Sequence, residues 1–470
     1  MNFKSISYYL SFFCFPIAIL AFINILYSSY FDYFLSIESY FITSLVSITI
    51  GVILFYIGKN SEKKINFIEQ LILIILVYLI TGFLISIPFY LSNFQINLIS
   101  SYFESISGLT GTGFSVFENI KYLDPTLILW RSSSQWVGGL FFLCFLVLLF
   151  SNRKFNFKMT NLTFSEESNL KSKENIKIII LKIFIFYSIL SFIFFTLLNI
   201  CGVRLFNSLN LSMTLVSNGG FLPTNSLKEI ISTNYQKIVM ILLLTISMLN
   251  FYLMFNILNR RVFTKEHKED FYLLGAAIFL ILIIYFNNLD TFDVVISVLS
   301  SLANSGVSLL EKENNLSLYF LFIAMIGGSL ISNTSGIKLS RFYILTKITS
   351  LEIIKLISPN NIINKTIFSS DSKITDDSIK ISFLIFISFF LSLFILSSLL
   401  ILDNIGFEQS FKLSILTLTN TVNSGMYGLE NLNFSFLLTS SKISLIIFMI
   451  IGKIELVSIF LIFKKIFLKE

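Results

Sequence analysis

Long apolar stretches recur from one end of the chain to the other and are separated by short polar connections. Ten of them come close to or exceed about 20 mainly apolar residues, the length at which a helix crosses a bilayer. They span residues 7–27, 37–58, 67–91, 126–150, 176–201, 236–258, 271–287, 316–357, 379–402 and 437–468. This pattern predicts an all-α integral membrane protein that crosses the bilayer many times.

From residue 67 onward one unit recurs four times: an apolar span, a short amphipathic stretch, a glycine-containing turn and a second span. The amphipathic stretches are 99–107, 205–216, 292–302 and 407–421. The turns are Thr110-Gly111-Thr112-Gly113, Ser217-Asn218-Gly219-Gly220, Ala303-Asn304-Ser305-Gly306 and Val422-Asn423-Ser424-Gly425. We expect four pseudo-symmetric helix–pore-loop–helix repeats around a central pore, with Gly113, Gly220, Gly306 and Gly425 as equivalent residues.

These repeats suggest a division of the chain into five parts. A two-span N-terminal domain takes residues 1–65, and the pore repeats take 66–158, 159–262, 263–358 and 359–470. The third repeat has a broken second helix, because the 316–357 span is too long for one crossing and is interrupted at Gly327-Gly328 and at Ser332–Gly336 by residues that form helices poorly. A break at membrane depth is tolerated beside a water-filled path, so this segment is a candidate gate.

The four turns have the chemistry of a cation filter. Non-helical backbone inside a membrane must be buried in protein or line a watery cavity. A ring of backbone carbonyls that replaces the hydration shell of a cation needs glycines and small or hydroxylated neighbours. No charged side chain lies in any of the turns. We therefore expect carbonyl and hydroxyl coordination of a monovalent ion, with the partially negative C-terminal ends of the amphipathic helices aimed at it.

Composition and charge agree with this interpretation. The chain is 55% hydrophobic and 13% charged, with a mean hydropathy of +0.83, whereas soluble domains carry roughly 25% charged residues. The net charge is +7, and the excess of lysine and arginine lies in alternate loops. This distribution predicts cytoplasmic N- and C-termini. The high charge thus indicates topology and not nucleic-acid binding.

Few residues are available for catalysis or for a resident metal. The three cysteines, Cys14, Cys144 and Cys201, lie in apolar surroundings and suit packing. The one histidine, His267, falls in the charged run 265–270, where we expect a solvated loop. We therefore expect no enzyme activity and no tightly bound cofactor, and the only metal is a transported cation.

Several strings resemble the Trk/Ktr/HKT superfamily of potassium transport proteins, within it the bacterial TrkH type. Residues 103–113 resemble the family's first filter, and Trp130-Arg131 with Gln135-Trp136-Val137-Gly138-Gly139 matches a highly specific family stretch. Residues 326–329, 336–341 and 451–456 are similar to later family segments. The chain departs from the family at Gly111, which replaces a threonine, at Ile331, Thr334 and Ser335, which replace glycines, and at Lys453, which replaces an arginine.

The resemblance implies inward potassium transport in a bacterial plasma membrane. Filter residues would be the four turns above. The gate would comprise Ser332, Asn333, Thr334, Ser335, Gly336, Lys338 and Lys453, with Lys453 contacting the broken segment. The resemblance also implies a homodimer regulated by a cytoplasmic nucleotide-binding ring of the TrkA type.

Three questions stay open at this point. Glu104 and Arg131 either pair to brace the first filter or lie at the outer water boundary. A sodium-coupled solute symporter also uses broken helices, but it predicts two inverted halves. A polytopic membrane enzyme is a further alternative, and it predicts converging histidine and carboxylate side chains.

Overall fold

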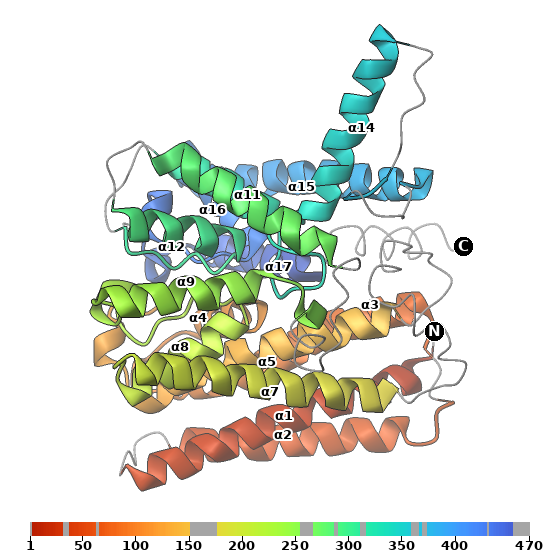
Figure 1. Ribbon diagram of the computed structural model, residues 1–470. Coiled ribbons are helices and arrows are strands. Elements are labelled where there is room, and N and C mark those ends of the chain that lie inside the picture. Colours follow the sequence, from red (N-terminus) through yellow and green to blue (C-terminus); the bar gives the residue numbers. More distant parts are fainter. Residues whose placement is uncertain are drawn as a thin grey trace.

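The computed structural model describes residues 2–31, 37–62, 65–150, 176–253, 267–285, 290–310, 316–358, 366–368, 374–429 and 432–454. Every regular element in these ranges is a helix, as expected. Most of the long helices run side by side through one bundle, and α14 projects from it (Figure 1). A continuous apolar core extends from α1 to α17.

Two helices precede the repeated part of the chain. They are α1 (Phe3–Tyr30) and α2 (Ile37–Gly58), which pack along each other and against α3 at one edge of the bundle (Figure 1). Helix α1 also contacts α5. The two predicted N-terminal spans are therefore present.

Four units with the same helix order follow. The first helices of the units are α3 (Phe67–Tyr90), α7 (Ile176–Ile200), α11 (Lys268–Tyr285) and α15 (Asp376–Leu402). The short central helices are α4 (Leu98–Thr110), α8 (Leu205–Val216), α12 (Thr291–Leu302) and α16 (Phe407–Thr419). The last helices are α5 (Pro125–Phe150), α9 (Asn234–Met248), α13 (Ser317–Ile326) with α14 (Leu339–Ile357), and α17 (Thr439–Ile454).

Every predicted span thus contains a helix, and the 316–357 span is broken as expected. The ends of the 236–258, 271–287 and 437–468 spans lie outside the described residues, as do the basic residues of 153–173, 260–265 and 464–469. The limits of the five predicted parts of the chain stay predictions.

The four units close into a ring. Within each unit the first helix packs against the short one: α3 on α4, α7 on α8, α11 on α12 and α15 on α16. The last helix of each unit then packs against the short helix of the next: α5 on α8, α9 on α12, α13 on α16 and, closing the circle, α17 on α4. Units one and three therefore face each other across the centre, as do units two and four.

The distribution of polar and apolar side chains suits a membrane. Large apolar side chains are exposed on the outer helices, among them Phe22, Phe192, Phe279 and Phe394. Serine, threonine and asparagine side chains are buried along the short helices and their turns. Five described helices are long and apolar enough to cross a bilayer: α1, α2, α3, the 179–200 part of α7 and α15.

Of the run 265–270 the structure describes 267–270, and there His267 does not lie in a solvated loop, so that expectation was wrong. His267 is buried and its Nδ1 lies 3.5 Å from Oδ2 of Asp270. Asp270 accepts a hydrogen bond from the amide of Asn250, and Glu269 accepts one from the amide of Leu330. The carboxylates of Asp270 and Glu269 are buried because the interior amide groups at these helix breaks need hydrogen-bond acceptors. As predicted, Cys14 and Cys144 are buried packing residues, and Cys201 is half-buried.

Candidate functional site

The four short helices end in the same way. The residue after each helix, or after one further turn residue, has a positive φ: Gly111 (79°), Asn218 (56°), Asn304 (57°) and Asn420 (48°). Each of these residues donates its amide to the carbonyl three positions earlier, over 3.0–3.3 Å. Asparagine and glycine are the residues that adopt the left-handed conformation most readily. The four turns are therefore equivalent in backbone geometry.

This geometry corrects the register of the fourth turn. The residue two positions after the left-handed one is a glycine in the first three units: Gly113, Gly220 and Gly306. In the fourth unit the residue at the same position is Val422. Gly425, which the sequence suggested as the fourth counterpart, lies three residues further on and begins the 3-10 helix Gly425–Tyr427. Matching Asn423-Ser424-Gly425 with Asn304-Ser305-Gly306 misplaced the turn, because the residue that ends the helix is Asn420.

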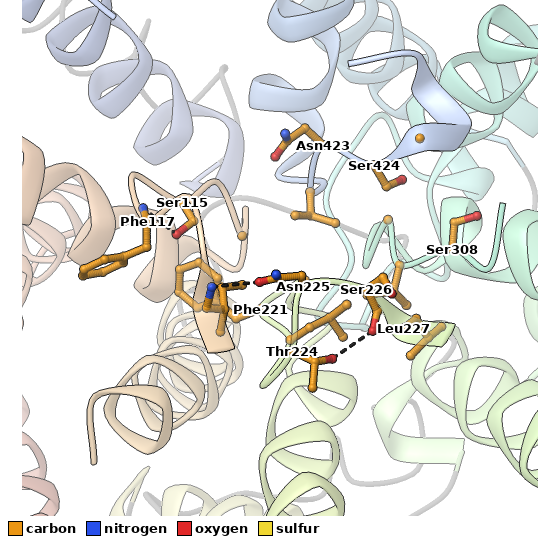
Figure 2. A pocket seen from close by; sticks show the side chains of 18 of the residues that line it. Ser115, Phe117, Phe221, Thr224, Asn225, Ser226, Leu227, Ser308, Asn423 and Ser424 are labelled. Atoms are coloured by element: carbon orange, nitrogen blue, oxygen red, sulfur yellow. Dashed lines mark hydrogen bonds between the residues drawn. The ribbon is translucent and has the colours of Figure 1, made fainter. Parts of the chain in front are cut away.

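One cavity brings all four turns together. It has a volume of about 510 Å³ and is lined by Gly113, Gly220, Gly306 and residues 422–425 of the predicted filter. Figure 2 shows Asn423 and Ser424 on one side, facing Thr224, Asn225 and Leu227 of the second unit across the cavity. The other predicted filter residues do not line this cavity; they are Thr110, Gly111, Thr112, Ser217, Asn218, Gly219, Ala303, Asn304 and Ser305, all of them buried.

The turns approach one another closely, and backbone oxygens concentrate where they meet. A β-carbon added at Gly220 would lie 2.7 Å from the carbonyl oxygen of Ser305. One added at Gly306 would lie 2.7 Å from the carbonyl oxygen of Val422. Glycine is needed here because any side chain would displace a neighbouring backbone, and Gly306 also has a φ of +70°.

Hydroxyl and amide groups join the turns beneath the cavity. Within the first turn Thr110 pairs with Thr112 over 2.7 Å, and within the fourth Thr419 pairs with Thr421 over 2.9 Å, whereas the contact between the two turns is made by Asn420. The side-chain amide of Asn420 lies 3.0 Å from the hydroxyl of Thr112. These groups are buried and uncharged, so the meeting place of the turns is rich in oxygen but carries no formal charge.

Glu104 and Arg131 form a buried ion pair, which decides between the two alternatives. Arg131 Nε lies 2.8 Å from Glu104 Oε1, and both side chains are at most 1% exposed. The second carboxylate oxygen accepts the amide of Val116, and the guanidinium lies 4.1 Å from the ring centre of Phe221 in the second unit. The pair therefore fixes the chain just beyond the first turn to the second turn.

The string Gln135–Gly139 has a structural purpose that its sequence alone did not reveal. Gln135 Oε1 accepts the amide of Phe221, which follows the second turn. A β-carbon on Gly138 would lie 2.0 Å from the carbonyl oxygen of Leu109, and one on Gly139 would lie 2.9 Å from Cβ of Ser217. This face of α5 thus seats the ends of two short helices.

The break between α13 and α14 folds back beneath the turns. Asn333 donates its side-chain amide to the carbonyl of Val216 at the end of α8, over 2.9 Å. The hydroxyl of Ser335 lies 3.1 Å from the side-chain amide of Asn420 in the fourth turn. The segment between α13 and α14 therefore contacts two opposite units of the ring.

Two lysines hold this segment. Lys338 donates to the carbonyls of Ser329, Ser332 and Thr334 and to the Thr334 hydroxyl, and its own φ is +75°. Lys453 of α17 donates to the carbonyl of Asn333 over 2.8 Å, the contact with the broken segment that we expected. Its ammonium also lies 4.7 Å from the ring centre of Phe142.

The fold and the site together define a class: a multi-pass membrane protein in which four pore loops from consecutive units surround one cavity. The family model described as TrkH, cation transport protein, matches residues 36–302. This chain belongs to that family of cation transport proteins.

Individual relatives are similar over most of the chain. An uncharacterized cation transporter of Methanocaldococcus jannaschii is 27% identical over 421 residues, which cover 87% of this chain and 85% of the relative. The Trk system potassium uptake protein TrkH of Salmonella typhimurium is 22% identical, with coverages of 91% and 92%. The crystal structure of the potassium transporter TrkH from Vibrio parahaemolyticus has the same fold, with a TM-score of 0.88, 18% identity and 98% coverage of both chains.

Proposed function

We propose that this chain conducts potassium ions into the cell through its four turns. The observation that carries the proposal is the convergence of four equivalent, uncharged turns on one cavity. Relatives named as potassium uptake proteins, such as TrkH of Salmonella typhimurium and TrkG of Escherichia coli, support the choice of ion. The four units follow one another in a single cyclic order, which does not suit the two inverted halves of a symporter.

The turns offer what a dehydrated monovalent cation needs. Backbone oxygens of Ser305 and Val422 face the glycines of neighbouring turns, and the hydroxyl of Thr112 contacts the side chain of Asn420 in the fourth turn. Oxygen dipoles replace the hydration shell without the tight hold of a carboxylate ring. The C-terminal ends of α4, α8, α12 and α16 add roughly half a negative charge each. A cation is thereby stabilised while remaining free to leave.

The cavity would be the extracellular entrance, with both termini cytoplasmic. The membrane potential would then drive inward movement, at about 2.3 kcal/mol per charge for each 100 mV. On the opposite side of the turns, Ser332–Gly336 with Lys338 and Lys453 would form the gate. The basic inner loops would dock a nucleotide-binding ring of the TrkA type, and two copies of this chain would assemble in a bacterial plasma membrane.

The test is uptake of rubidium, as a tracer for potassium, into proteoliposomes under a negative internal potential. Wild type is compared with Gly113→Ser, in which the new β-carbon would lie 3.0 Å from Gly220 Cα and from Val422 Cβ. The matched control is Gly275→Ser, because a β-carbon there meets nothing within 4 Å. We expect wild type and the control to take up rubidium with little competition from sodium, and the Gly113 variant to lose uptake or this preference. Equal sodium and potassium flux in wild type, or none above empty vesicles, would contradict the proposal.

A further inference from the structure

The ring of filter glycines is incomplete in this protein. Three of its positions are Gly113, Gly220 and Gly306, and the fourth is Val422, as shown by the shared left-handed residue two positions earlier. The hydrogen bonds agree, since Gly219, Ser305 and Thr421 all donate their amides to the carbonyl five positions earlier. One unit therefore places an isopropyl group where the others carry only hydrogen.

That isopropyl group reaches the other three turns. A β-carbon on Gly113 would lie 3.0 Å from both Cβ and Cγ2 of Val422. One on Gly220 would lie 2.3 Å from Cβ and 2.6 Å from Cγ1, and one on Gly306 would lie 2.9 Å from Cγ1. Gly220 belongs to the second unit, which stands opposite the fourth in the ring. The side chain of Val422 therefore extends across the centre of the ring.

The same side chain forms part of the cavity surface. Val422 lines the cavity together with the three glycines and is 9% exposed. An isopropyl group offers no oxygen to an ion that has shed water, and apolar constrictions in pores also exclude water. Valine is branched at the β-carbon, so it has few rotamers with which to move aside.

From this arrangement we propose that the Val422 side chain is the narrowest constriction of the conduction pathway and limits the rate of ion passage. The proposal rests on the proposed function, because it assumes that ions pass between the four turns. An ion reaches the far side of the ring only when the fourth turn shifts and withdraws the side chain. A valine that served packing alone would affect stability and leave the flux unchanged.

The test compares rubidium and potassium uptake by wild type with Val422→Ala, Val422→Gly and Val422→Ile at equal protein amounts. We expect Val422→Gly to raise the flux roughly tenfold, as a barrier lower by about 1.4 kcal/mol would. Val422→Ala should fall between it and wild type, and Val422→Ile should conduct less than wild type. Val77→Ala is the control, since Val77 is a buried valine of α3 that does not line the cavity.

The two proposals fail separately. Wild-type uptake above empty vesicles tests the proposed function, whereas the ratio of variant to wild type tests the constriction. Val422→Gly and Val422→Ala at the rate of a conducting wild type would overturn the constriction alone. Uptake at background in wild type and in both variants would contradict the proposed function, and with it the constriction that rests on it. If wild type takes up no more rubidium than empty vesicles while Val422→Gly conducts, the constriction is supported, and uptake by the unmodified chain is contradicted. Size-exclusion profiles and thermal unfolding confirm that the variants are folded, so a rate difference reports on the pathway.

Discussion

The ammonium group of Lys453 donates a hydrogen bond to the backbone carbonyl of Asn333, 120 positions away along the chain, over 2.8 Å. Asn333 in turn reaches the end of α8 beneath the second turn. The contact ties the last helix of the ring to the break between α13 and α14, so it favours the arrangement in which that segment lies under the turns.

Lys453→Ala should raise the open probability and the flux in reconstituted membranes. A hydrogen bond from a charged group contributes about 1.5–3 kcal/mol, so its loss shifts the closed-to-open equilibrium by roughly tenfold or more. Single-channel or flux recordings measure this shift. Lys380→Ala is the control, because Lys380 is exposed on α15. An open probability equal to that of wild type would refute a closing role for Lys453.

Replacing either partner of the Glu104–Arg131 pair should strongly destabilise the fold. Each single alanine variant leaves one buried charge without its partner, which costs about 3–5 kcal/mol. The fall in the free energy of unfolding should be smaller for the double variant than the sum of the falls for the two single variants. Thermal unfolding in detergent provides the double-mutant cycle. The exposed pair Glu352–Lys355 is the comparison, with an expected effect below about 1 kcal/mol. Strict additivity at Glu104 and Arg131 would contradict a coupled pair.

Gly138→Ala should disrupt the packing of α4 on α5. Its β-carbon would lie 2.0 Å from the carbonyl oxygen of Leu109, a contact that only a backbone shift relieves. We expect the free energy of unfolding to fall by about 3 kcal/mol, the upper end of the usual range for overpacking, seen as a lower unfolding temperature or as aggregated protein. Gly275→Ala should instead leave the free energy of unfolding unchanged or raise it by up to about 1 kcal/mol, because alanine has the higher helix propensity. Equal stability of the two variants would show that α4 does not depend on this close approach.

Lys338→Met should loosen the segment between α13 and α14. The lysine satisfies three carbonyls of that segment, and methionine keeps the bulk of the side chain without the donors. Hydrogen exchange at the amides of residues 328 and 337, which are hydrogen-bonded in the structure, should accelerate. Lys355→Met on the exposed face of α14 should leave that exchange unchanged. Unaltered protection in Lys338→Met would mean that the segment is held by its other contacts.

The sequence predicted the helical framework because bilayer-crossing helices follow from apolar length alone. The four short helices, the broken third unit and the contact of Lys453 were also predictable, since each leaves a local pattern or a family string. The fourth turn was not. Its register depends on the residue at which α16 ends, and a string containing Asn-Ser-Gly occurs just beyond the true position. His267 was misplaced for a related reason, because its neighbours Asp270 and Glu269 accept hydrogen bonds from the amides of Asn250 and Leu330, and the local sequence does not show these contacts.

The packing of α17 against α4 has a consequence for biogenesis. Lys442 of α17 donates to the hydroxyl of Ser100 in α4, over 2.9 Å. A helix of the fourth unit therefore completes a contact of the first unit, which is synthesised long before it. Because α17 packs against both α16 and α4, the fourth unit can join the first only after α17 has been inserted. A chain that stops before residue 439 would lack α17, so the ring could not close and α4 would lose the helix that packs around Ser100.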